Sequence, residues 1–375
     1  MNYLIIGSGV AAISAVKEIL KNRSDNDSIR VVSDEKYPFY YRPRLIHCLS
    51  GEVEVDDIII NDKQWFEDND INLHLEERVN EVKIDNKIVV TEKSEYKFDK
   101  LLLANGAHSF LPPVSGANEE NVFTLRSAED AEEIYKVASK SEKAVVIGGG
   151  LLGLESAYYL SKAGLEVKVM ERGSYLLKRQ LDKHGGEILQ ELLEDKGIDF
   201  VLNANTKEII SEKNSLEVLE ENKGSFNTDL ILFSTGIRSN TELVENTEIN
   251  INRGIIVNNK METSVDNIYA AGDVAEYDGR VYGIWPPSME EGKIAGKNMV
   301  DNISEFNGFV SSYSLKVAGI SLVSKGIVDD EENYKVEKEE KDGKYKKIIY
   351  DGDKVVGIIL IGDFSNKKEL VNMVE

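Results

Sequence analysis

The sequence predicts an α/β fold: two Rossmann-like dinucleotide-binding domains, then a small α+β C-terminal domain. Each large domain is expected to have three layers, with a parallel sheet and an antiparallel β-meander. A strand, a glycine turn, a helix and a strand open the chain, and the same pattern returns 141 residues later (Gly7 to Gly148). Because that spacing is far too long for a solenoid repeat, it indicates two copies of one domain.

The first copy begins with the apolar strand Tyr3–Ile6, followed by a helix over Val10–Leu20 and a strand over Ile29–Ser33. In a glycine motif the first glycine permits a tight turn, the second admits a pyrophosphate, and a small third residue lets helix and strand pack closely. The residues between strand and helix fit this motif: Gly7, Ser8, Gly9, Val10, Ala11 and Ala12.

An acidic residue beyond the second strand is expected to bind the ribose hydroxyls of the first dinucleotide. Ser33 stands at the usual position, so Asp34 or Glu35 must serve, and we favour Glu35. The alternative is a solvated turn, because Asp34-Glu35-Lys36 is a run of charges.

The second copy fits the pattern better. A strand at Ala144–Ile147 and a helix at Leu151–Ala163 flank Gly148-x-Gly150-x-x-Gly153. Glu171 closes the next strand, where a carboxylate binds ribose hydroxyls and repels a 2′-phosphate, so NADH is expected over NADPH. Arg172 weakens that inference, because an arginine can accommodate the phosphate.

The remaining pattern places the boundaries. We expect an antiparallel meander over 82–100, a buried strand at Leu101–Leu103, and a helix over about 288–300. Strand-like runs follow at Ser314–Ile320, Tyr345–Tyr350 and Val355–Ile361, and the charged stretch from 329 to 347 reads as a solvated hairpin. The predicted domains are a first dinucleotide-binding domain in two parts, 1–112 and 241–304, a second dinucleotide-binding domain at 113–240 and a C-terminal domain at 305–375.

Composition narrows the class of protein. With 45 Lys and Arg against 67 Asp and Glu, the net charge of −22 argues against binding to nucleic acid or to an anionic membrane. A single cysteine allows no disulfide and no Cys-x-x-Cys pair, and the four histidines lack metal-ligand spacing, so we expect no metal. The chain shows no basic leader with a cleavage site, and we expect a cytoplasmic protein.

Four stretches, in this order and spacing, resemble the two-dinucleotide-binding flavoproteins, that is, the pyridine nucleotide-disulfide oxidoreductases. The resemblance implies FAD at the first motif and NAD at the second. It also implies that Asp273 contacts FAD and that Glu155 acts where nicotinamide meets flavin. The stretches are Gly7 to Ala12, Ala104-Asn105-Gly106, Gly148 to Glu155, and Tyr269-Ala270-Ala271-Gly272-Asp273.

Further stretches narrow the branch. Tyr41 to Leu45, Arg179 to Asp182 and Leu315 to Gly319 resemble NADH:rubredoxin oxidoreductases and the flavin domain of assimilatory nitrite reductases. The resemblance implies that electrons leave one at a time to a small iron protein, with rubredoxin as the expected partner. The contacts it assigns to FAD further include Lys36, Arg42, Pro43, Val79, Trp285 and Ser288; those it assigns to NAD include Leu151, Leu152, Arg172 and Gly236.

Some positions depart from the family pattern. Asn105 replaces the threonine of an Ala-Thr-Gly triplet, and an amide still offers a side-chain hydrogen bond. His47 stands where related reductases carry a lysine, so it could hydrogen-bond or protonate the flavin, or be a packed surface histidine. Trp285 is expected either beside the flavin ring or as an ordinary buried tryptophan, at the start of a helix opened by two prolines.

Other functions remain open. A peroxidase or oxidase would use Cys48, but the family position for that cysteine is 43 or 44, so a buried small hydrophobe is the default. An NADH-sensing flavoprotein is a further alternative. Since rubredoxins are usually acidic, docking would need a basic patch, for which we name Arg42 and Arg44. We expect a monomer.

Overall fold

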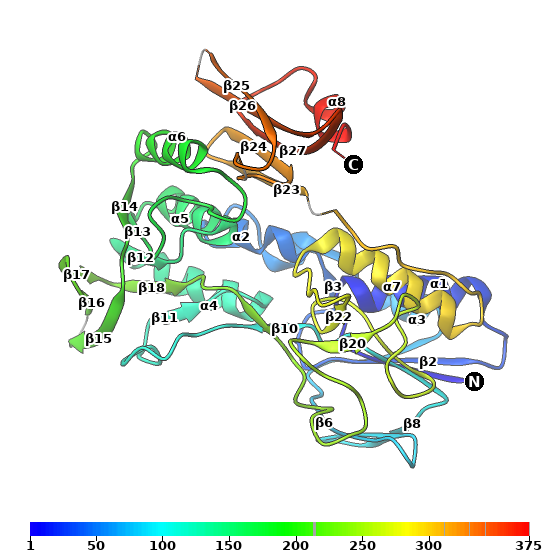
Figure 1. Cartoon of the computed structure of the whole chain (residues 1–375). Coiled ribbons are helices and arrows are strands. Elements are labelled where there is room, and N and C mark those ends of the chain that lie inside the picture. The colour runs from blue at the N-terminus through cyan, green and yellow to red at the C-terminus, as the bar shows by residue number, and fades with distance from the viewer. Residues whose placement is uncertain (213–214, 311, 330, 342, 375) are drawn as a thin grey trace.

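The first of two large units, which we call the first half, is built on a parallel sheet (Figure 1). It combines the beginning of the chain with a later segment that includes residues 268–299. The computed structural model describes residues 1–212, 215–310, 312–329, 331–341 and 343–374. All neighbouring strands of this sheet run parallel, in the order β21-β9-β1-β2-β5. They span Ile268–Ala270, Lys100–Leu103, Asn2–Ile6, Ser28–Val32 and Ile71–His74. The strands are mostly buried, which explains their almost purely apolar sequence.

Helices α1 (Val10–Asn22) and α7 (Trp285–Met299) lie side by side against this sheet (Figure 1). A methyl group at Gly292 would lie 2.2 Å from the carbonyl oxygen of Ala11, so the two helices touch backbone to backbone. α7 begins three residues before the predicted position of 288. An antiparallel meander completes this half: β6 (Val79–Lys83), β7 (Ile88–Thr91) and β8 (Glu95–Lys97).

The second half repeats the architecture. Its parallel sheet has the order β11-β18-β12-β13-β14, spanning Val122–Thr124, Leu230–Phe233, Lys143–Ile147, Glu166–Glu171 and Ile198–Leu202. Helices α4 (Ala128–Ala138), α5 (Leu151–Lys162) and α6 (Lys183–Glu194) belong to this half. Its antiparallel meander consists of β15 (Thr206–Glu212), β16 (Ser215–Glu220) and β17 (Gly224–Thr228). The predicted fold class is therefore confirmed for both halves.

Short elements connect these layers. Strands β10 (Ala107–Ser109) and β19 (Ile237–Ser239) pair antiparallel where the chain passes between the halves. Two more pairs are β3 (Phe39–Tyr40) with β4 (Ile59–Asn61), and β20 (Ile255–Val257) with β22 (Ala275–Tyr277). The short helices are η1 (Arg42–Arg44), α2 (Leu45–Cys48), η2 (Val55–Ile58) and α3 (Lys63–Asp68).

The C-terminal domain is an antiparallel sheet with one short helix, α8 (Lys367–Asn372). Its order is β23-β24-β27-β26-β25, spanning Ser312–Val317, Ile320–Gly326, Lys354–Ile361, Lys344–Asp351 and Lys335–Lys341. The predicted run Ser314–Ile320 is wrong as one strand. Ala318 and Gly319 have φ values of +55° and +79° and turn the chain between β23 and β24.

The charged stretch 329–347 is only partly the solvated hairpin that we predicted. β25 and β26 do form a hairpin, and positions 330 and 342 lie outside the described residues. Lys347, however, is 0% exposed, with its Nζ 2.9 Å from Asp182 and 3.0 Å from Glu331. Because alternate strand residues share a face, Lys347 follows Tyr345 into the interface with α6.

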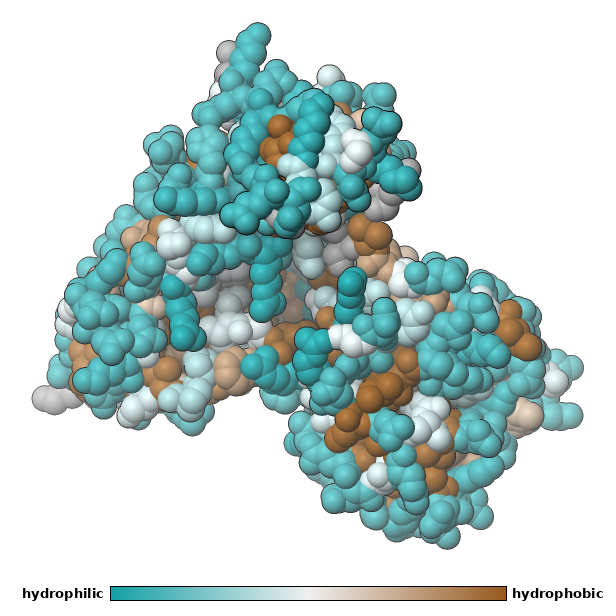
Figure 2. All heavy atoms as spheres, in the orientation of Figure 1, coloured by the Kyte–Doolittle hydropathy of each residue, from teal (hydrophilic) through white to brown (hydrophobic). Residues whose placement is uncertain are grey.

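Packing does not follow the predicted domain boundaries in every place. One hydrophobic core joins the second sheet to the inner face of the C-terminal domain and to the segment from Tyr40 to Ile58. Helix α2 therefore packs against α4 and α5 of the second half. Hydrophilic residues dominate the molecular face drawn in Figure 2.

Among the described residues, no helix combines the length and apolar character that a membrane crossing requires.

Candidate active site

The first glycine motif is a tight turn with an open side. Gly7 has φ +103°, and a methyl group there would lie 2.2 Å from the carbonyl oxygen of Ala104 on the neighbouring strand. At Gly9 the same methyl would meet no protein atom within 4 Å. The turn therefore presses against the sheet at Gly7 and leaves room for a ligand at Gly9.

The helix N-termini differ in whether a side chain caps them, and the short helices α2 and α8 are also uncapped. Side chains of Asp62, Ser127 and Asp182 cap α3, α4 and α6. Helices α1, α5 and α7 have no side-chain cap. The first N–H groups of α1 and α5 are thus free to meet an anionic group, whereas α7, with Pro286 and Pro287 in its first turn, offers mainly its positive dipole end.

A cavity of about 830 Å³ opens at the first motif. Most residues predicted to bind FAD line it, although they come from distant parts of the chain. They are Gly7, Ser8, Gly9, Val10, Ala11, Glu35, Arg42, Pro43, Val79, Ala104, Asn105, Gly106, Gly272, Asp273, Trp285 and Ser288. Ala12 is fully buried behind this wall, and Lys36 lies in a smaller, charged hollow that shares Asp34, Arg78 and Glu129 with the cavity.

Glu35 is held in one orientation in the cavity wall. The guanidinium of Arg42 donates to its Oε1 at 2.6 Å, and the hydroxyl of Tyr40 donates to its Oε2 at 2.5 Å. Burial alone would raise the pKa of Glu35, but Arg42 and Tyr40 hold that pKa below its usual value. The carboxylate is therefore ionised and oriented to accept hydrogen bonds from a diol.

Arg126 is a site residue that our sequence analysis missed. It lines the cavity and forms a 2.7 Å ion pair with Asp273, while its carbonyl oxygen accepts a hydrogen bond from Arg42. The sequence does indicate a helix start next to Arg126, because Ser127 and Asp130 form a capping box. Nothing local announces the partner, since Arg126 and Asp273 lie 147 residues apart in the chain.

A second missed residue, Glu291, lies beneath the cavity wall in α7. It is 2% exposed and accepts the N–H of Gly272 at 2.8 Å. Burial raises the pKa of Glu291 to about 8, assisted by the nearby Asp273. This acid therefore carries a proton at neutral pH.

Trp285 takes its predicted place at the first turn of α7. Its ring stacks on Phe39 at 5.8 Å between centroids and meets Tyr41 edge-on at 5.0 Å. Three residues later the Ser288 hydroxyl donates to the carbonyl oxygen of Ile284 at 3.0 Å, and it lies 3.3 Å from Asp273. The aromatic ring thus closes one end of the cavity beside a helix start.

The second motif repeats the first. Gly148 has φ +120°, and a methyl group there would lie 2.2 Å from the carbonyl oxygen of Ser234. At Gly153 a methyl would lie 2.0 Å from the carbonyl oxygen of Gly148, whereas at Gly150 it would meet nothing within 4 Å. The turn again packs tightly on both sides of one open glycine.

Glu171 closes β13 beside this turn. Its two oxygens accept the N–H groups of Gly149 at 2.6 Å and Gly173 at 2.5 Å. Arg172 is exposed, and Gly236 has φ +102° in the connection that returns to the first half. The carboxylate is thus oriented by backbone donors alone, at the position predicted for a ribose ligand.

Helix α5 links the two motifs. It begins at Leu151 of the second motif, and its residues Leu152 and Glu155 line the cavity at the first motif. Leu152 is 41% exposed, and burial raises the pKa of Glu155 to about 7. A carboxyl group that can hold or release a proton near neutral pH therefore stands where the two sites meet.

His47 and Cys48 do not line the cavity. The ring of His47 packs on Tyr159 at 4.5 Å between centroids, and burial together with Arg44 lowers the pKa of His47. Cys48 is 5% exposed within the core that joins the second sheet to the C-terminal domain, which we call the second core. Burial raises the pKa of the Cys48 thiol to about 11. The structure thus gives His47 the packed position rather than one against the cavity. Among the described residues, no cluster of His, Cys, Asp and Glu could hold a metal ion.

Two dinucleotide cradles on one chain, joined by a helix that serves both, define the class of two-dinucleotide oxidoreductases. The chain belongs to the pyridine nucleotide-disulphide oxidoreductase family, whose model matches residues 1–292. A second model, the rubredoxin NAD+ reductase C-terminal domain, matches residues 312–375.

Two similar proteins, one of them with a solved structure, support the assignment. The chain is 37% identical over 376 residues to the NAD(P)H nitrite reductase of Bacillus subtilis, covering 99% of this chain but 47% of that protein. It is 33% identical over 363 residues to the NADH-rubredoxin oxidoreductase of Clostridium acetobutylicum, covering 96% and 91%. The crystal structure of the Clostridium acetobutylicum NADH:rubredoxin oxidoreductase superposes with a TM-score of 0.86 at 32% identity, covering 100% of this chain and 94% of that one.

The residues present fit the FAD and NAD(H) that this family binds. The cavity falls within the range of cofactor sites, and Gly9 and Gly150 leave open the space that a pyrophosphate needs. Uncapped helices α1 and α5 supply N–H donors to it. Glu35 and Glu171 offer fixed carboxylates for ribose hydroxyls.

Proposed function

We propose that this protein is an FAD-dependent NADH oxidoreductase that passes electrons to a small iron protein of the rubredoxin type. One observation carries the proposal: Leu152 and Glu155, on the helix of the second motif, stand in the wall of the cavity at the first. A nicotinamide held at the second motif would therefore reach a flavin held at the first.

Each group of residues has a defined task in this proposal. The first motif, Glu35, Arg42, Arg126 and Asp273 hold FAD, and the second motif with Glu171 and Arg172 holds NADH. When bound, FAD accepts a hydride from NADH and gives up electrons one at a time. Glu155 holds a proton near neutral pH at the meeting point, and the free N-terminus of α7 favours negative charge beside Trp285.

The identity of the acceptor is supported by the likeness of residues 312–375 to the rubredoxin reductase C-terminal domain and by the relative from Clostridium acetobutylicum. The chain spans about half of the nitrite reductase that it resembles, so an iron-containing partner of another kind fits the same chemistry. We further propose a cytoplasmic monomer with the predicted domain boundaries.

Docking would depend on local charge, because the net charge of −22 repels an acidic carrier. Arg42 cannot belong to the basic patch that we predicted, since its guanidinium is bound to Glu35 and to the carbonyl oxygen of Arg126. Arg44 remains a candidate, and its positive charge already acts on His47. Electron transfer to the carrier should accordingly weaken as salt is added.

An anaerobic titration tests the proposal. The purified protein should be yellow, and NADH should bleach the flavin absorbance. Oxidised rubredoxin, mixed with the bleached protein, should restore the yellow colour. Failure to reduce rubredoxin together with rapid consumption of oxygen or peroxide would favour an NADH oxidase instead. Bleaching slower than about one event per minute would indicate an NADH-sensing flavoprotein, since enzymes usually turn over at 1–1000 per second.

A further inference from the structure

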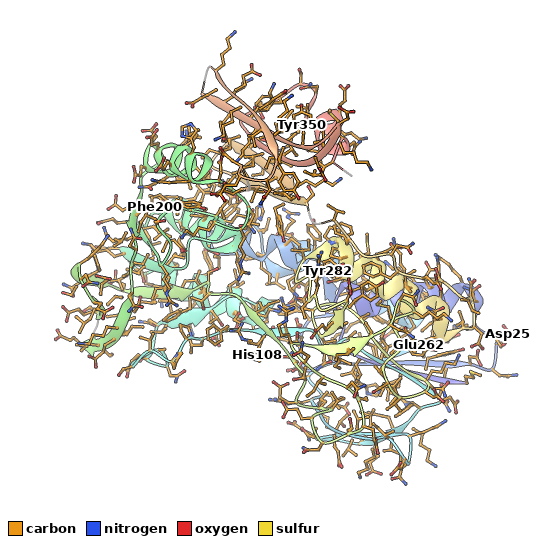
Figure 3. The ribbon with its side chains drawn as sticks, viewed as in Figure 1. Asp25, His108, Phe200, Glu262, Tyr282 and Tyr350 are labelled. Atoms are coloured by element: carbon orange, nitrogen blue, oxygen red, sulfur yellow. The ribbon has the colours of Figure 1, made fainter. Side chains whose placement is uncertain are left out.

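The two chain segments that join the halves are tied together by side chains as well as by backbone. β10 and β19 pair antiparallel, the N–H of Phe110 donates to the carbonyl oxygen of Gly236 at 2.8 Å, and the N–H of Asn240 donates to that of Gly106 at 3.0 Å. Asn105, Asn240 and His108 stand at this joint, and all three line the cavity. Figure 3 shows His108 there, between the halves.

Asn105 and Asn240 hold each other reciprocally. The Nδ2 of Asn105 donates to the backbone carbonyl of Asn240 at 2.9 Å, and the Nδ2 of Asn240 donates to the backbone carbonyl of Asn105 at 2.7 Å. Since a carbonyl oxygen only accepts, both side-chain amides must turn their nitrogen toward the partner. The orientation of each amide is therefore fixed by the other residue.

This orientation also fixes the proton on His108. With its nitrogen turned to Asn105, Asn240 presents Oδ1 to the Nδ1 of His108 at 2.7 Å. An oxygen without hydrogen can only accept, so Nδ1 must carry the proton. The three residues form one directed chain of hydrogen bonds, which we call the joint clamp.

The clamp forms although it leaves one polar atom unsatisfied. The Oδ1 of Asn105 is buried and has no hydrogen-bond partner in the described part of the chain. A buried acceptor without a donor is costly, so the bonds to Asn240 must outweigh that cost in setting the orientation of Asn105. A threonine, as in the family triplet, has one hydroxyl and carries no amide pair of this kind.

We propose that Asn105, Asn240 and His108 are positioning residues: the joint clamp fixes the second half, and with it Glu155 and Leu152, against the cavity of the first half. This rests on the proposed function, because the position matters for transfer between two bound dinucleotides. Close contact between reacting rings is sensitive to displacements of about 1 Å, which can change a rate about a hundredfold. The clamp acts at the chain segments that run between the halves, in addition to the packing of α2 on α4 and α5 and the ion pair of Arg126 with Asp273.

Charge-neutral variants test the clamp. In Asn105→Ala, Asn240→Ala and the double variant, flavin bleaching at saturating NADH, counted per bound FAD, should slow at least about tenfold. The double variant should be no slower than the worse single one, because both remove the same unit. Asn227→Ala, an exposed asparagine on β17, is the matched control and should behave as wild type.

Two readouts need no turnover. Amide exchange at Phe110 and Asn240 should accelerate at least about tenfold in the variants, with or without FAD, since these N–H groups close the joint. Nitrogen NMR should find the proton of neutral His108 on Nδ1 in wild type. In Asn240→Ala, which lacks the acceptor, the proton should be shared between Nδ1 and Nε2. Unchanged exchange and an Nε2 proton in wild type would overturn the clamp.

The outcomes separate this inference from the proposed function. If the wild-type protein binds no FAD, or if NADH does not bleach it, the proposed function is refuted. Amide exchange at Phe110 and Asn240 and the position of the His108 proton then still test the clamp in the apoprotein. Faster amide exchange in the variants with an unchanged rate of flavin bleaching would mean that the clamp only stabilises the joint, and would refute the positioning role.

Discussion

The two glycine motifs of this chain share a backbone design and differ in what surrounds it. At each, the first glycine presses on a neighbouring strand and the second faces open space. Around the first, side chains from both halves close the site: Arg42 holds Glu35, and Arg126 pairs with Asp273. Around the second, Glu171 is held by backbone N–H groups alone. This difference fits the proposed function, in which FAD stays bound and NADH exchanges at each turnover.

The largest expected effect comes from the tight glycines. Gly7→Ala should abolish FAD binding and yield colourless protein, because a β-carbon 2.2 Å from a carbonyl oxygen forces the turn of the first motif to shift. Gly148→Ala meets an equally close oxygen but should leave a yellow protein that NADH no longer bleaches. Flavin absorbance and NADH titration distinguish the two.

Gly9→Ala is the control for that pair. The added methyl meets no protein atom within 4 Å, so the thermal midpoint of the apoprotein should not change. FAD affinity should still fall, since the methyl occupies ligand space. If Gly7→Ala stays yellow and stable, the first motif is not the retaining site.

Arg126→Met should weaken FAD binding about a hundredfold and leave NADH affinity nearly unchanged, because it strands the Asp273 carboxylate without its partner. Equilibrium dialysis of FAD measures the first effect. Arg280→Met, at an exposed arginine, is the matched control. An equal loss of FAD in both variants would remove Arg126 from the site.

Stability should separate wild type from Glu291→Gln as pH rises. Burial holds the pKa of Glu291 at about 8 in the folded chain against 4.5 for an ordinary glutamate, so the native state binds an extra proton between those values. Wild type therefore loses stability from pH 4.5 to 8, and the variant does not. At pH 8 Glu291→Gln should be more stable by on the order of 4 kcal/mol, which is about 1.4 kcal/mol for each unit of the pKa difference.

Urea unfolding at several pH values measures this difference. Glu155→Gln should show a smaller gain that levels off near pH 7, because its pKa is raised only to about 7. A gain that does not depend on pH would mean that neither acid is protonated in the native state.

The sequence predicted the local features well and the long-range ones poorly. Both glycine turns and the parallel strands follow from short patterns, because turn sterics and burial act between neighbouring residues. The start of α7 was predicted three residues too late. Arg126 with Asp273, and Lys347 with Asp182, join residues 147 and 165 positions apart, and no local pattern encodes such pairs. His47 illustrates the same limit, since its contact with Tyr159 depends on how two helices meet.

Glu171→Ala should weaken NADH binding about tenfold and reduce the discrimination against NADPH, because the carboxylate repels a 2′-phosphate. FAD content should not change, as Glu171 has no part in the first cavity. Glu166→Ala, at the exposed start of the same strand, is the control. Tighter NADPH binding in the control as well would show a general charge effect.

Cys48→Ala should have the smallest effect, because the thiol belongs to neither cradle. Cys48 is 5% exposed in the second core, and with a pKa of about 11 it is almost entirely protonated at neutral pH, whereas a peroxide-reducing cysteine must be a thiolate. Peroxide and oxygen turnover should stay within about twofold of wild type, and stability should fall by about 1 kcal/mol for the lost sulfur. Loss of peroxide turnover in a variant that keeps its flavin would instead establish a thiol mechanism, with Cys48 as a catalytic residue.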